Sequence, residues 1–309
     1  MSGEALKLGV LRLGTRRSLM ATTQSGQVAD RLTALTGHTV ELVGVTTFGD
    51  VTKTQLAQLG GTGVFVSALR DKLIAGDIDF AVHSLKDLPT KPDPRVVIAA
   101  IPPRDDPRDA LVGPAALADL PPGARVGTGS PRRVAQLRLL RPDLDYVPIR
   151  GNADTRIGKV TSGELSAVVL AAAGLGRIGR QAEISQLFDV DEMLPAPGQG
   201  ALAVECRADD AALVELLAVL DDPRTRAAVT AERALLATLE GGCHAPVGAY
   251  AADDGHILNL TATVVAIDGA RSVRKSTAGD PSAAMELGRD LAAAMIAEGA
   301  GTLMGERTH

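Results

Sequence analysis

The sequence is poor in aromatic residues, and this shortage limits what the protein can bind. Aromatic residues make up 2% of the 309 residues and tryptophan is absent, so the cores must be built mainly from Ala, Val and Leu. Few side chains are available to stack on nucleic-acid bases. The formal net charge of −5 also argues against a general binder of phosphate backbones. We therefore expect no nucleic-acid partner.

Cysteine is also scarce, and long apolar runs are missing. The two cysteines, Cys206 and Cys243, show no CxxC or Cys/His metal spacing, so we expect no metal site and favour free thiols over a disulfide. No uncharged apolar run approaches the roughly 18 residues of a membrane span, and the first residues lack an apolar signal region. These features predict a cytoplasmic protein without a membrane partner.

What the sequence does contain is typical of a soluble globular protein of several domains. Hydrophobic residues make up 45% and charged residues 22%, and 309 residues exceed what one core usually holds. Arginine dominates the cations, with 25 Arg and 7 Lys making up the 32 basic residues. A planar guanidinium is well suited to clamping carboxylates.

The hydrophobic pattern alternates between strands and helices in the first two thirds of the chain. Strands are predicted at 8–13, 40–45, 80–82, 96–101, 125–128, 145–149, 167–170 and 201–206, and helices at 18–35, 64–75, 130–140 and 155–162. Ser130 followed by Pro131 is an N-cap signal with proline at the first helical position. Two Pro-rich segments, 101–109 and 194–200, look like linkers. This order predicts two clefted, hinge-type βα domains.

The last third of the sequence predicts a small α+β domain. Asp222-Pro223 and Asp280-Pro281 repeat the cap-then-proline signal and open helices to Leu239 and Ile296. Strands are expected between them at 247–251, 258–267 and 272–276.

The most informative residue is Cys243, in the segment Gly241-Gly242-Cys243-His244-Ala245-Pro246. Two glycines before it and a proline soon after it predict a loop. A lone thiol on such a loop suits a covalent attachment point or a nucleophile. Cys206, inside a predicted strand, is better explained as a buried structural thiol.

Five further segments share one character, a turn after a predicted strand with a cation and usually a hydroxyl. They lie at 12–18, 83–90, 127–133, 150–156 and 174–177. Most open a helix, whose free N–H groups favour anions. One arginine at a helix start is usually a solvated charge, but five such turns indicate a site for a polyanionic guest.

One acid stands out among these cations. Asp87, beside Lys86 in the second turn, is either a cap or ion-pair partner, or an acid/base group held among positive charges. His83 and His244 are weaker candidates for a base, because a lone histidine near a turn is more often structural.

Taken together, these segments resemble the hydroxymethylbilane synthase (porphobilinogen deaminase) family. The resemblance covers about 11–251, with the C-terminal domain matching in general pattern. It is carried by five motifs in the family's order: Arg-x-Gly-Thr-Arg at 12–16, His-Ser-x-Lys-Asp-x-Pro-Thr at 83–90, Arg-Gly-Asn-x-x-Thr-Arg at 150–156, Pro-Gly-Gln-Gly-Ala at 197–201 and Gly-Gly-Cys-x-x-Pro at 241–246.

The resemblance implies an activity and a role for each matching residue. The enzyme would join four porphobilinogen molecules on a dipyrromethane cofactor held as a thioether by Cys243, with Asp87 as catalytic acid/base. The implied cofactor ligands are Ser84, Lys86, Thr128, Ser130, Arg132 and Arg133. The implied substrate-side residues are Arg16, Ser18, Gln24, Phe65, Arg150, Arg156 and Arg177.

The resemblance also implies an α/β architecture, with two periplasmic-binding-protein-like βα domains around a cleft plus a small C-terminal α+β domain, in a monomer. Domain 1 would comprise 1–103 and 201–221, domain 2 would comprise 104–200, and domain 3, carrying the Cys243 loop, would comprise 222–309.

Two other functions fit parts of the sequence. A non-enzymatic anion-binding protein with the hinge fold would explain the arginine turns but not the Gly-Gly-Cys loop. A Cys-dependent hydrolase or acyl transferase would use Cys243 with His244, but adjacent residues rarely suit proton transfer between a thiol and an imidazole.

The sequence also departs from the family pattern at Leu19-Met20, at Gly61-Thr62-Gly63 and around Ser130, where Gly129 and Pro131 stand.

Overall fold

A computed structural model describes residues 9–45, 62–241 and 245–304, and of residues 62–65 it describes the backbone. The chain divides into two compact units, and each is described by itself. Unit 1 consists of Met1–Leu88, Pro92–Pro102 and Leu202–Asp222, and unit 2 consists of Pro89–Lys91, Pro103–Ala201 and Pro223–His309.

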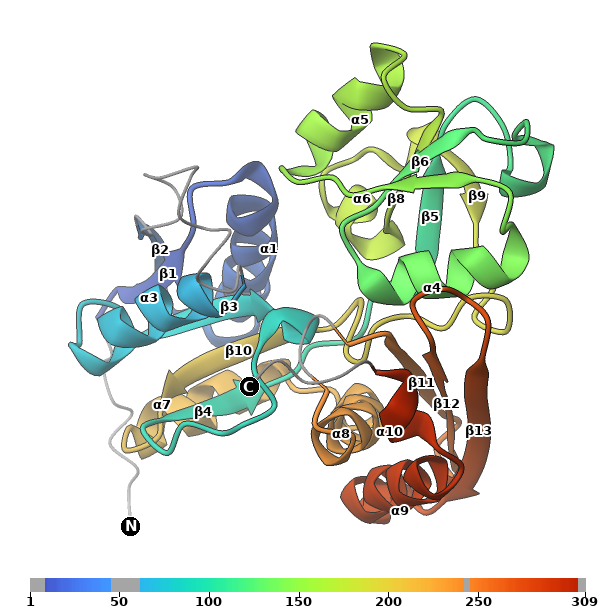
Figure 1. Cartoon of the computed structure of the whole chain (residues 1–309). Coiled ribbons are helices and arrows are strands. Elements are labelled where there is room, and N and C mark those ends of the chain that lie inside the picture. The colour runs from blue at the N-terminus through green and yellow to red at the C-terminus, as the bar shows by residue number, and fades with distance from the viewer. Residues whose placement is uncertain (1–8, 46–61, 242–244, 305–309) are drawn as a thin grey trace. The chain divides into compact units, whose positions relative to one another are not determined.

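Unit 1 is built on a five-stranded mixed sheet in the order β2-β1-β3-β10-β4 (Figure 1). Its strands are β1 (Leu11–Thr15), β2 (Val40–Gly44), β3 (Phe80–Ser84), β4 (Val96–Ala100) and β10 (Leu202–Arg207). β1 runs parallel to β2 and β3. β10 follows the long excursion through unit 2 and pairs antiparallel with β3 and β4. The alternation of strands and helices predicts a parallel or mixed sheet covered by helices, and the sheet is mixed.

Helices cover both faces of this sheet. They are α1 (Leu19–Thr36), α3 (Thr62–Ile74), α7 (Ala211–Leu217) and the 3-10 turns η1 (Leu85–Asp87) and η4 (Ala218–Leu220). On one face Leu32 of α1 and Leu213 of α7 belong to the core cluster that contains Leu13. On the other face Leu69 and Leu73 of α3 pack in a second cluster. Burying each such leucine contributes about 1.5–3 kcal/mol.

Unit 2 contains a second five-stranded mixed sheet, in the order β7-β6-β8-β5-β9. Its strands are β5 (Asp109–Val112), β6 (Arg125–Gly127), β7 (Asp145–Val147), β8 (Ala167–Ala171) and β9 (Ile184–Leu187). β6 runs parallel to β7 and β8, whereas β5 pairs antiparallel with β8 and β9. β5 and β9 were not predicted, because the first follows a Pro-rich segment that reads as a linker and the second, Ile-Ser-Gln-Leu, has two polar residues at its centre.

The helices of this part are α4 (Pro131–Leu140), α5 (Ala153–Thr161), α6 (Ala172–Arg177) and the 3-10 turns η2 (Leu117–Asp119) and η3 (Gln181–Glu183). The predicted start of α4 is confirmed: Ser130 is the N-cap, its side chain accepts a hydrogen bond from the Arg133 backbone N–H, and Pro131 is the first helical residue. Gly174–Arg177 was predicted as a turn and instead forms most of α6.

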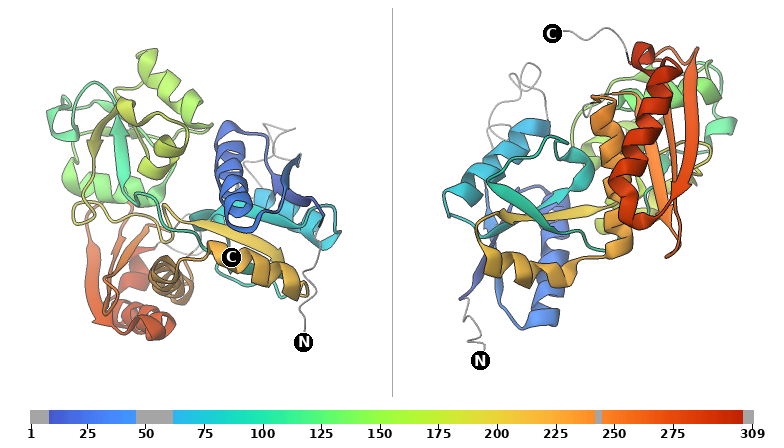
Figure 2. Two further views of the ribbon diagram at one scale, coloured as in Figure 1. Left: turned by 180° about the vertical axis from the view of Figure 1, so that it is seen from behind. Right: turned by 90° about the horizontal axis from the view of Figure 1, so that it is seen from below.

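The C-terminal part forms a separate small domain with its own sheet. Its elements are α8 (Pro223–Thr238), β11 (Val247–Asp253), β12 (Leu258–Val265), β13 (Ser272–Gly279), η5 (Pro281–Ala283), α9 (Ala284–Ala297) and α10 (Ala300–Leu303). The three strands form an antiparallel sheet in chain order. Figure 2 shows α8 and α9 running along this sheet. The expected α+β domain is confirmed.

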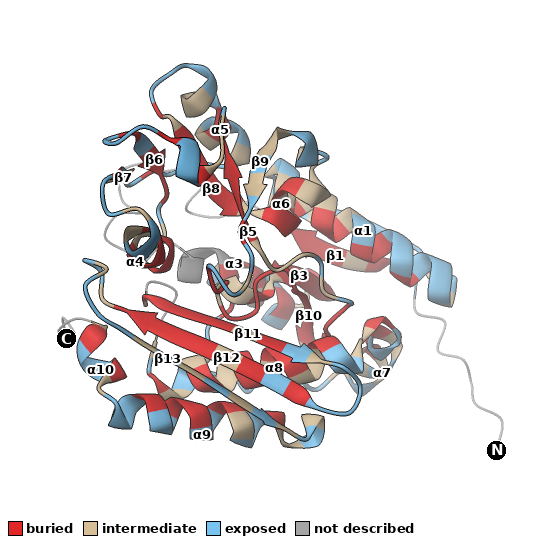
Figure 3. Cartoon of the chain, turned by 90° about the vertical axis from the view of Figure 1, so that its right-hand side faces the viewer, coloured by how far each residue is buried: buried red, intermediate tan, exposed pale blue. Residues whose placement is uncertain are grey.

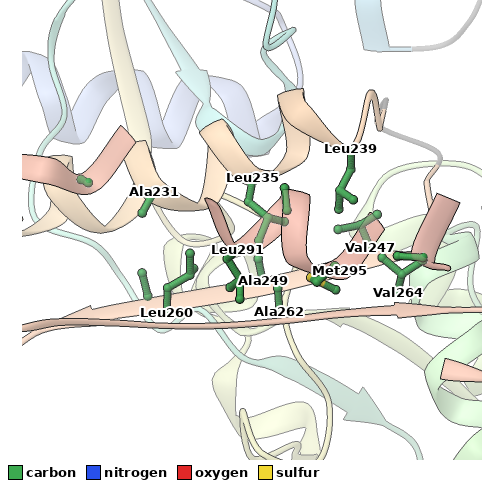
Figure 4. Close-up of a cluster of buried hydrophobic side chains, with 14 of the residues drawn as sticks. Ala231, Leu235, Leu239, Val247, Ala249, Leu260, Ala262, Val264, Leu291 and Met295 are labelled. Atoms are coloured by element: carbon green, nitrogen blue, oxygen red, sulfur yellow. The ribbon is translucent and has the colours of Figure 1, made fainter. Parts of the chain in front are cut away.

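The core of this domain lies between the sheet and the two long helices. Leu235 of α8, Leu260 of β12 and Met295 of α9 meet there, all fully buried (Figure 4). Buried and exposed positions alternate along α9 (Figure 3), as expected of an amphipathic helix. Gly288 permits close packing of the helices, since an added Cβ there would lie 2.2 Å from the Ala231 carbonyl oxygen of α8.

The fold class is therefore α/β with two mixed sheets, each built from alternating strands and helices, and a small C-terminal α+β domain. In the parts of the chain that the structure describes, none of the helices combines the length and the hydropathy needed to cross a membrane.

Candidate active site

In unit 1, the predicted site residues lie at one edge of the sheet. β1 and β3 are parallel neighbours, so the segments that follow them emerge at the same edge. The Ser84 hydroxyl at the end of β3 lies 3.4 Å from the Gln24 side-chain oxygen of α1, to which it donates a hydrogen bond. The structure thus brings together the segments that carry Arg16, Ser18, Gln24, Ser84, Lys86 and Asp87.

Asp87 is held on a short, firmly anchored turn. Leu85 and Leu88 are buried in the core of unit 1, and the Leu88 N–H donates to the Leu85 carbonyl oxygen at 3.1 Å. Lys86 and Asp87 lie between these two leucines and are partly exposed. Two buried anchors on either side fix the backbone of the turn, so the carboxylate and the ammonium are presented on a rigid support.

The His83 side chain lies in a different environment from that of its neighbour Ser84. Consecutive strand residues point to opposite faces of a sheet, and the His83 Nε2 lies 3.3 Å from Glu205 Oε2, without the alignment of a hydrogen bond. Arg70 of α3 binds the same carboxylate, with Nη2 2.7 Å from Oε1. Burial raises the pKa of Glu205, but His83 and Arg70 lower it by more. His83 therefore lies against the buried Arg70–Glu205 ion pair that ties α3 to the sheet.

In unit 2, the segments after the parallel strands β6, β7 and β8 also emerge at one edge. The side-chain oxygen of Thr128 accepts a hydrogen bond from the Ser130 N–H at 3.3 Å. The Ser130 cap then places Arg132 and Arg133 in the first turn of α4, where both are buried.

Asp109 is the partner of both arginines. It opens β5 opposite the end of β8 and is completely buried. Its Oδ2 accepts from Arg132 Nη1 at 2.7 Å, and its Oδ1 accepts from Arg133 Nη2 at 2.7 Å and from Gln199 Nε2 at 2.9 Å. Burial raises the pKa of Asp109, but the charges of Arg132 and Arg133 outweigh it and hold the pKa well below its usual range.

Arg150 and Arg156 are placed differently. The Arg156 Nε donates to the Gly151 carbonyl oxygen at 2.8 Å. Among the described residues neither arginine forms an ion pair with a carboxylate. Burial, followed by repulsion from Arg133, lowers the pKa of Arg156. This edge of the sheet therefore carries positive charge that the described carboxylates do not neutralise.

Arg177, by contrast, is engaged within the protein. Its Nε donates to Asp105 Oδ2 at 2.9 Å, and its Nη2 donates to the Gly200 carbonyl oxygen at 2.7 Å. Gly200 has a φ of 89°, a conformation that favours glycine. The Pro-Gly-Gln-Gly segment is thus built into a hydrogen-bonded network and is not a loose linker.

Glu232 joins this network to the C-terminal domain. The fully buried carboxylate accepts from Arg104 Nη1 at 2.6 Å, from the Gly198 N–H at 2.6 Å and from the Ala251 N–H at 2.8 Å. The Arg104 guanidinium also lies 5.3 Å from the centre of the Tyr250 ring. Breaking a buried pair of this kind costs about 3–5 kcal/mol. Sequence reasoning missed this contact, since its partners are far apart along the chain.

The segment that carries Cys243 connects α8 to β11, and Glu232 of α8 also accepts a hydrogen bond from β11. Cys243 and His244 fall outside the residues that the structure describes. The same is true of the Phe65 side chain, although Phe65 lies within α3. The chain leaves α8 sharply, since Glu240 has a φ of 53°. No group of three or more His, Cys, Asp or Glu residues within the described ranges is arranged to hold a metal ion.

Cys206 is the buried thiol that its position predicted. It is fully buried on β10 and belongs to the core of unit 1. Burial is the main cause that raises the pKa of its thiol to about 11, so at pH 8 almost none of it is the reactive thiolate.

We expect iodoacetamide at pH 8 to leave Cys206 unmodified in the folded protein and to alkylate it in denaturant. Peptide mapping of samples treated under the two conditions measures this. Rapid alkylation of Cys206 without denaturant would show that the strand is open to solvent.

Comparison with known proteins shows which protein family the sequence matches. The protein-family model described as "Porphobilinogen deaminase, dipyromethane cofactor binding domain" matches residues 11–215. A second family model, "Porphobilinogen deaminase, C-terminal domain", matches residues 226–297. The chain is 61% identical to a porphobilinogen deaminase of Thermobifida fusca, covering 96% of each chain. It is 60% identical to porphobilinogen deaminase 1 of Streptomyces coelicolor, covering 96% of this chain and 98% of that one.

Among solved structures, a periplasmic substrate-binding protein of an ABC transporter from Coxiella burnetii is 15% identical. The match covers 70% of this chain and 94% of that one, with a TM-score of 0.44.

Proposed function

The chain belongs to the porphobilinogen deaminase family, and from this membership we infer its reaction. It is a transferase that joins four porphobilinogen molecules head to tail on a dipyrromethane cofactor and then releases hydroxymethylbilane, a step in tetrapyrrole biosynthesis. Each condensation forms one carbon–carbon bond and releases one ammonia, and the final hydrolysis consumes one water.

The residues present fit an acidic cofactor. Arg132 and Arg133 face one carboxylate, Asp109, so this buried group retains a net positive charge. Arg132 Nε is buried and has no hydrogen-bond partner in the described part of the chain. Leaving such a donor unpaired costs about 1–3 kcal/mol, and a cofactor carboxylate would remove that cost. We propose Cys243 as the thioether anchor, with Ser84, Lys86, Thr128, Ser130, Arg132 and Arg133 as cofactor ligands.

We propose Asp87 as the group that moves protons. When bound, the dipyrromethane supplies the free pyrrole carbon to which the first substrate is joined. The Asp87 carboxylate would stabilise positive charge on the pyrrole nitrogens and accept or return a proton as ammonia leaves. Its rigid turn between Leu85 and Leu88 supports this role, since proton transfer requires a fixed distance between donor and acceptor.

The substrate side requires cations that remain available. Each pyrrole ring brings two carboxylates, so the growing chain adds negative charge at every step. We propose Arg16, Ser18, Gln24, Phe65, Arg150, Arg156 and Arg177 as substrate-side residues. Arg150 and Arg156 are the best supported, because neither has an ion-pair partner among the described carboxylates. Arg177 is already engaged with Asp105, so it would act by sharing its guanidinium.

Three finer features are also proposed. We propose that domain 1 comprises 1–103 and 201–221, domain 2 comprises 104–200 and domain 3 comprises 222–309; the division of the chain into compact units after Pro102 and after Ala201 supports the first of these. We propose further that the protein is a monomer and acts in the cytoplasm. Size-exclusion chromatography with light scattering tests the first, and fractionation of the producing cells tests the second.

The observation that carries the proposal is the match to the porphobilinogen deaminase family over most of the chain. The test is to incubate the purified protein with porphobilinogen and measure ammonia and tetrapyrrole together. We expect one ammonia per porphobilinogen consumed and one tetrapyrrole per four. Ammonia without tetrapyrrole, or no consumption, would contradict the proposed function.

We expect Arg150→Leu and Arg156→Leu to stall elongation. Each variant removes a cation that binds carboxylates of the growing chain, so covalent adducts with few added rings should accumulate while later ones are missing. Intact-mass spectra after a short pulse of porphobilinogen show this ladder. Arg125→Leu is the control, since Arg125 pairs with Asp145 on the exposed surface. A complete ladder in both variants would remove these residues from the substrate site.

A further inference from the structure

Asp109 is a buried acid to which neither the motifs nor the proposed mechanism gives a task. It lies at the start of β5 and is completely buried. We propose that Asp109 is a positioning residue, which orients Arg132 and Arg133 so that Arg132 presents a free guanidinium edge to a carboxylate of the cofactor. This inference rests on the proposed function.

Arg133 donates hydrogen bonds from each nitrogen of its guanidinium group. Its Nε and Nη2 both donate to Asp109 Oδ1, at 2.9 and 2.7 Å, and its Nη1 donates to the Val169 carbonyl oxygen at 2.8 Å. All three nitrogens are engaged with the protein. Arg133 is therefore fixed in place and contributes chiefly its positive charge.

Within the described ranges, Arg132 is hydrogen-bonded through one nitrogen. Its Nη1 donates to Asp109 Oδ2 and to the Leu194 carbonyl oxygen, both at 2.7 Å. Its Nε is buried without a partner in the described part of the chain. A carboxylate that binds side-on takes Nε–H and Nη2–H together. Asp109 thus occupies one end of the guanidinium and leaves open the edge that suits a second carboxylate.

Two buried arginines share one buried carboxylate, so the cluster carries a net positive charge where water does not screen it. An uncompensated buried charge is unfavourable, and one additional anion completes the cluster. Asp109 remains ionised at any working pH, because Arg132 and Arg133 hold its pKa below the usual range despite burial.

Gln199 helps to hold Asp109 in place. Gln199 Nε2 donates to Asp109 Oδ1 at 2.9 Å and to the Pro107 carbonyl oxygen at 2.7 Å. Asp109 is thereby held from a side that the arginines do not occupy. A fixed carboxylate gives the guanidiniums a fixed place, and a displacement of 1 Å at a binding group can cost about 100-fold in rate.

The experiment compares Asp109→Glu and Asp109→Asn with two controls. Asp106→Asn removes a carboxylate that pairs with Arg108 nearby in the chain and touches neither cofactor arginine. Leu111→Ala destabilises the same strand through the hydrophobic core cluster to which Leu111 belongs. Each full-length protein is made in cells unable to supply porphobilinogen, and its melting is followed by circular dichroism. Porphobilinogen is then added, and intact mass records how fast two pyrrole units are retained.

If Asp109 positions the arginines, Asp109→Glu keeps the charge and folds but acquires the cofactor at least ~10-fold more slowly than the wild type. Asp109→Asn is slower still, while both controls load at the wild-type rate. The inference is overturned if the Asp109 variants load normally, if Leu111→Ala slows loading equally, or if Asp109→Glu fails to fold where Leu111→Ala folds. Failure of the wild type to gain any mass would instead contradict the proposed function.

Discussion

Replacing Asp87 with Asn is expected to lower turnover by about 1,000-fold while the protein still folds and retains its cofactor. A positioned acid/base group contributes roughly 10²–10⁴-fold to a rate, and an amide can neither accept the proton nor balance a positive pyrrole nitrogen. The change is isosteric, and the buried anchors Leu85 and Leu88 keep the turn in place. Ammonia release and intact mass, measured on the same preparation, separate loss of turnover from loss of cofactor.

A matched control for this variant is Asp93→Asn. Asp93 lies on the same unit, is paired with Arg95, and is not part of the site. We expect Asp93→Asn to turn over at the wild-type rate. Activity of Asp87→Asn within a few-fold of the wild type would remove the carboxylate from the mechanism, whatever the control shows.

Replacing Cys243 with Ser is expected to abolish activity altogether. A serine oxygen does not replace the thiolate sulfur that forms the thioether, so the variant would remain without the cofactor and have no pyrrole carbon to extend. Cys206 cannot substitute, because it is buried in the core of unit 1 and burial raises the pKa of its thiol to about 11.

Cys206→Ser serves as the control for this variant, and it should retain both cofactor and activity. Its stability is expected to fall by about 1–3 kcal/mol, since a buried hydroxyl must find a hydrogen-bond partner. Chemical denaturation measures that change. Turnover by Cys243→Ser at more than a trace level would contradict the anchoring role.

The sequence predicted those elements whose signals are local. Ser130 and Pro131 gave the start of α4 to the residue, because capping depends on neighbours within one turn. The carboxyl ends of β1 and β3 were expected to carry the site segments, and the parallel pairing of these strands brings those segments together.

The sequence did not predict contacts that depend on long-range packing. Asp109 was assigned to the end of a linker, yet it opens β5 and pairs with arginines more than twenty residues away. The resemblance implied that Arg132 and Arg133 are cofactor ligands, and the structure shows that both bind Asp109. No pattern in the motifs identified Asp109 or Glu232, because neither residue lies in a segment with a recognisable spacing.

The packing also changes how the arginine turns are understood. Arg177 binds the Asp105 carboxylate and the Gly200 carbonyl oxygen of the protein itself, whereas Arg150 and Arg156 form no ion pair with a carboxylate among the described residues. Some of the guanidinium groups that the sequence alone assigns to ligand binding therefore stabilise the fold. The remaining arginines supply positive charge that would bind an acidic ligand.

The most direct measurement is the intact mass of the purified protein beside that of Cys243→Ser. The account predicts that the wild type is heavier than its chain by two linked pyrrole units and that the variant has the mass of the bare chain. Equal excess mass in both proteins, or a wild type that gains no mass after incubation with porphobilinogen, would contradict the covalent attachment of a cofactor at residue 243.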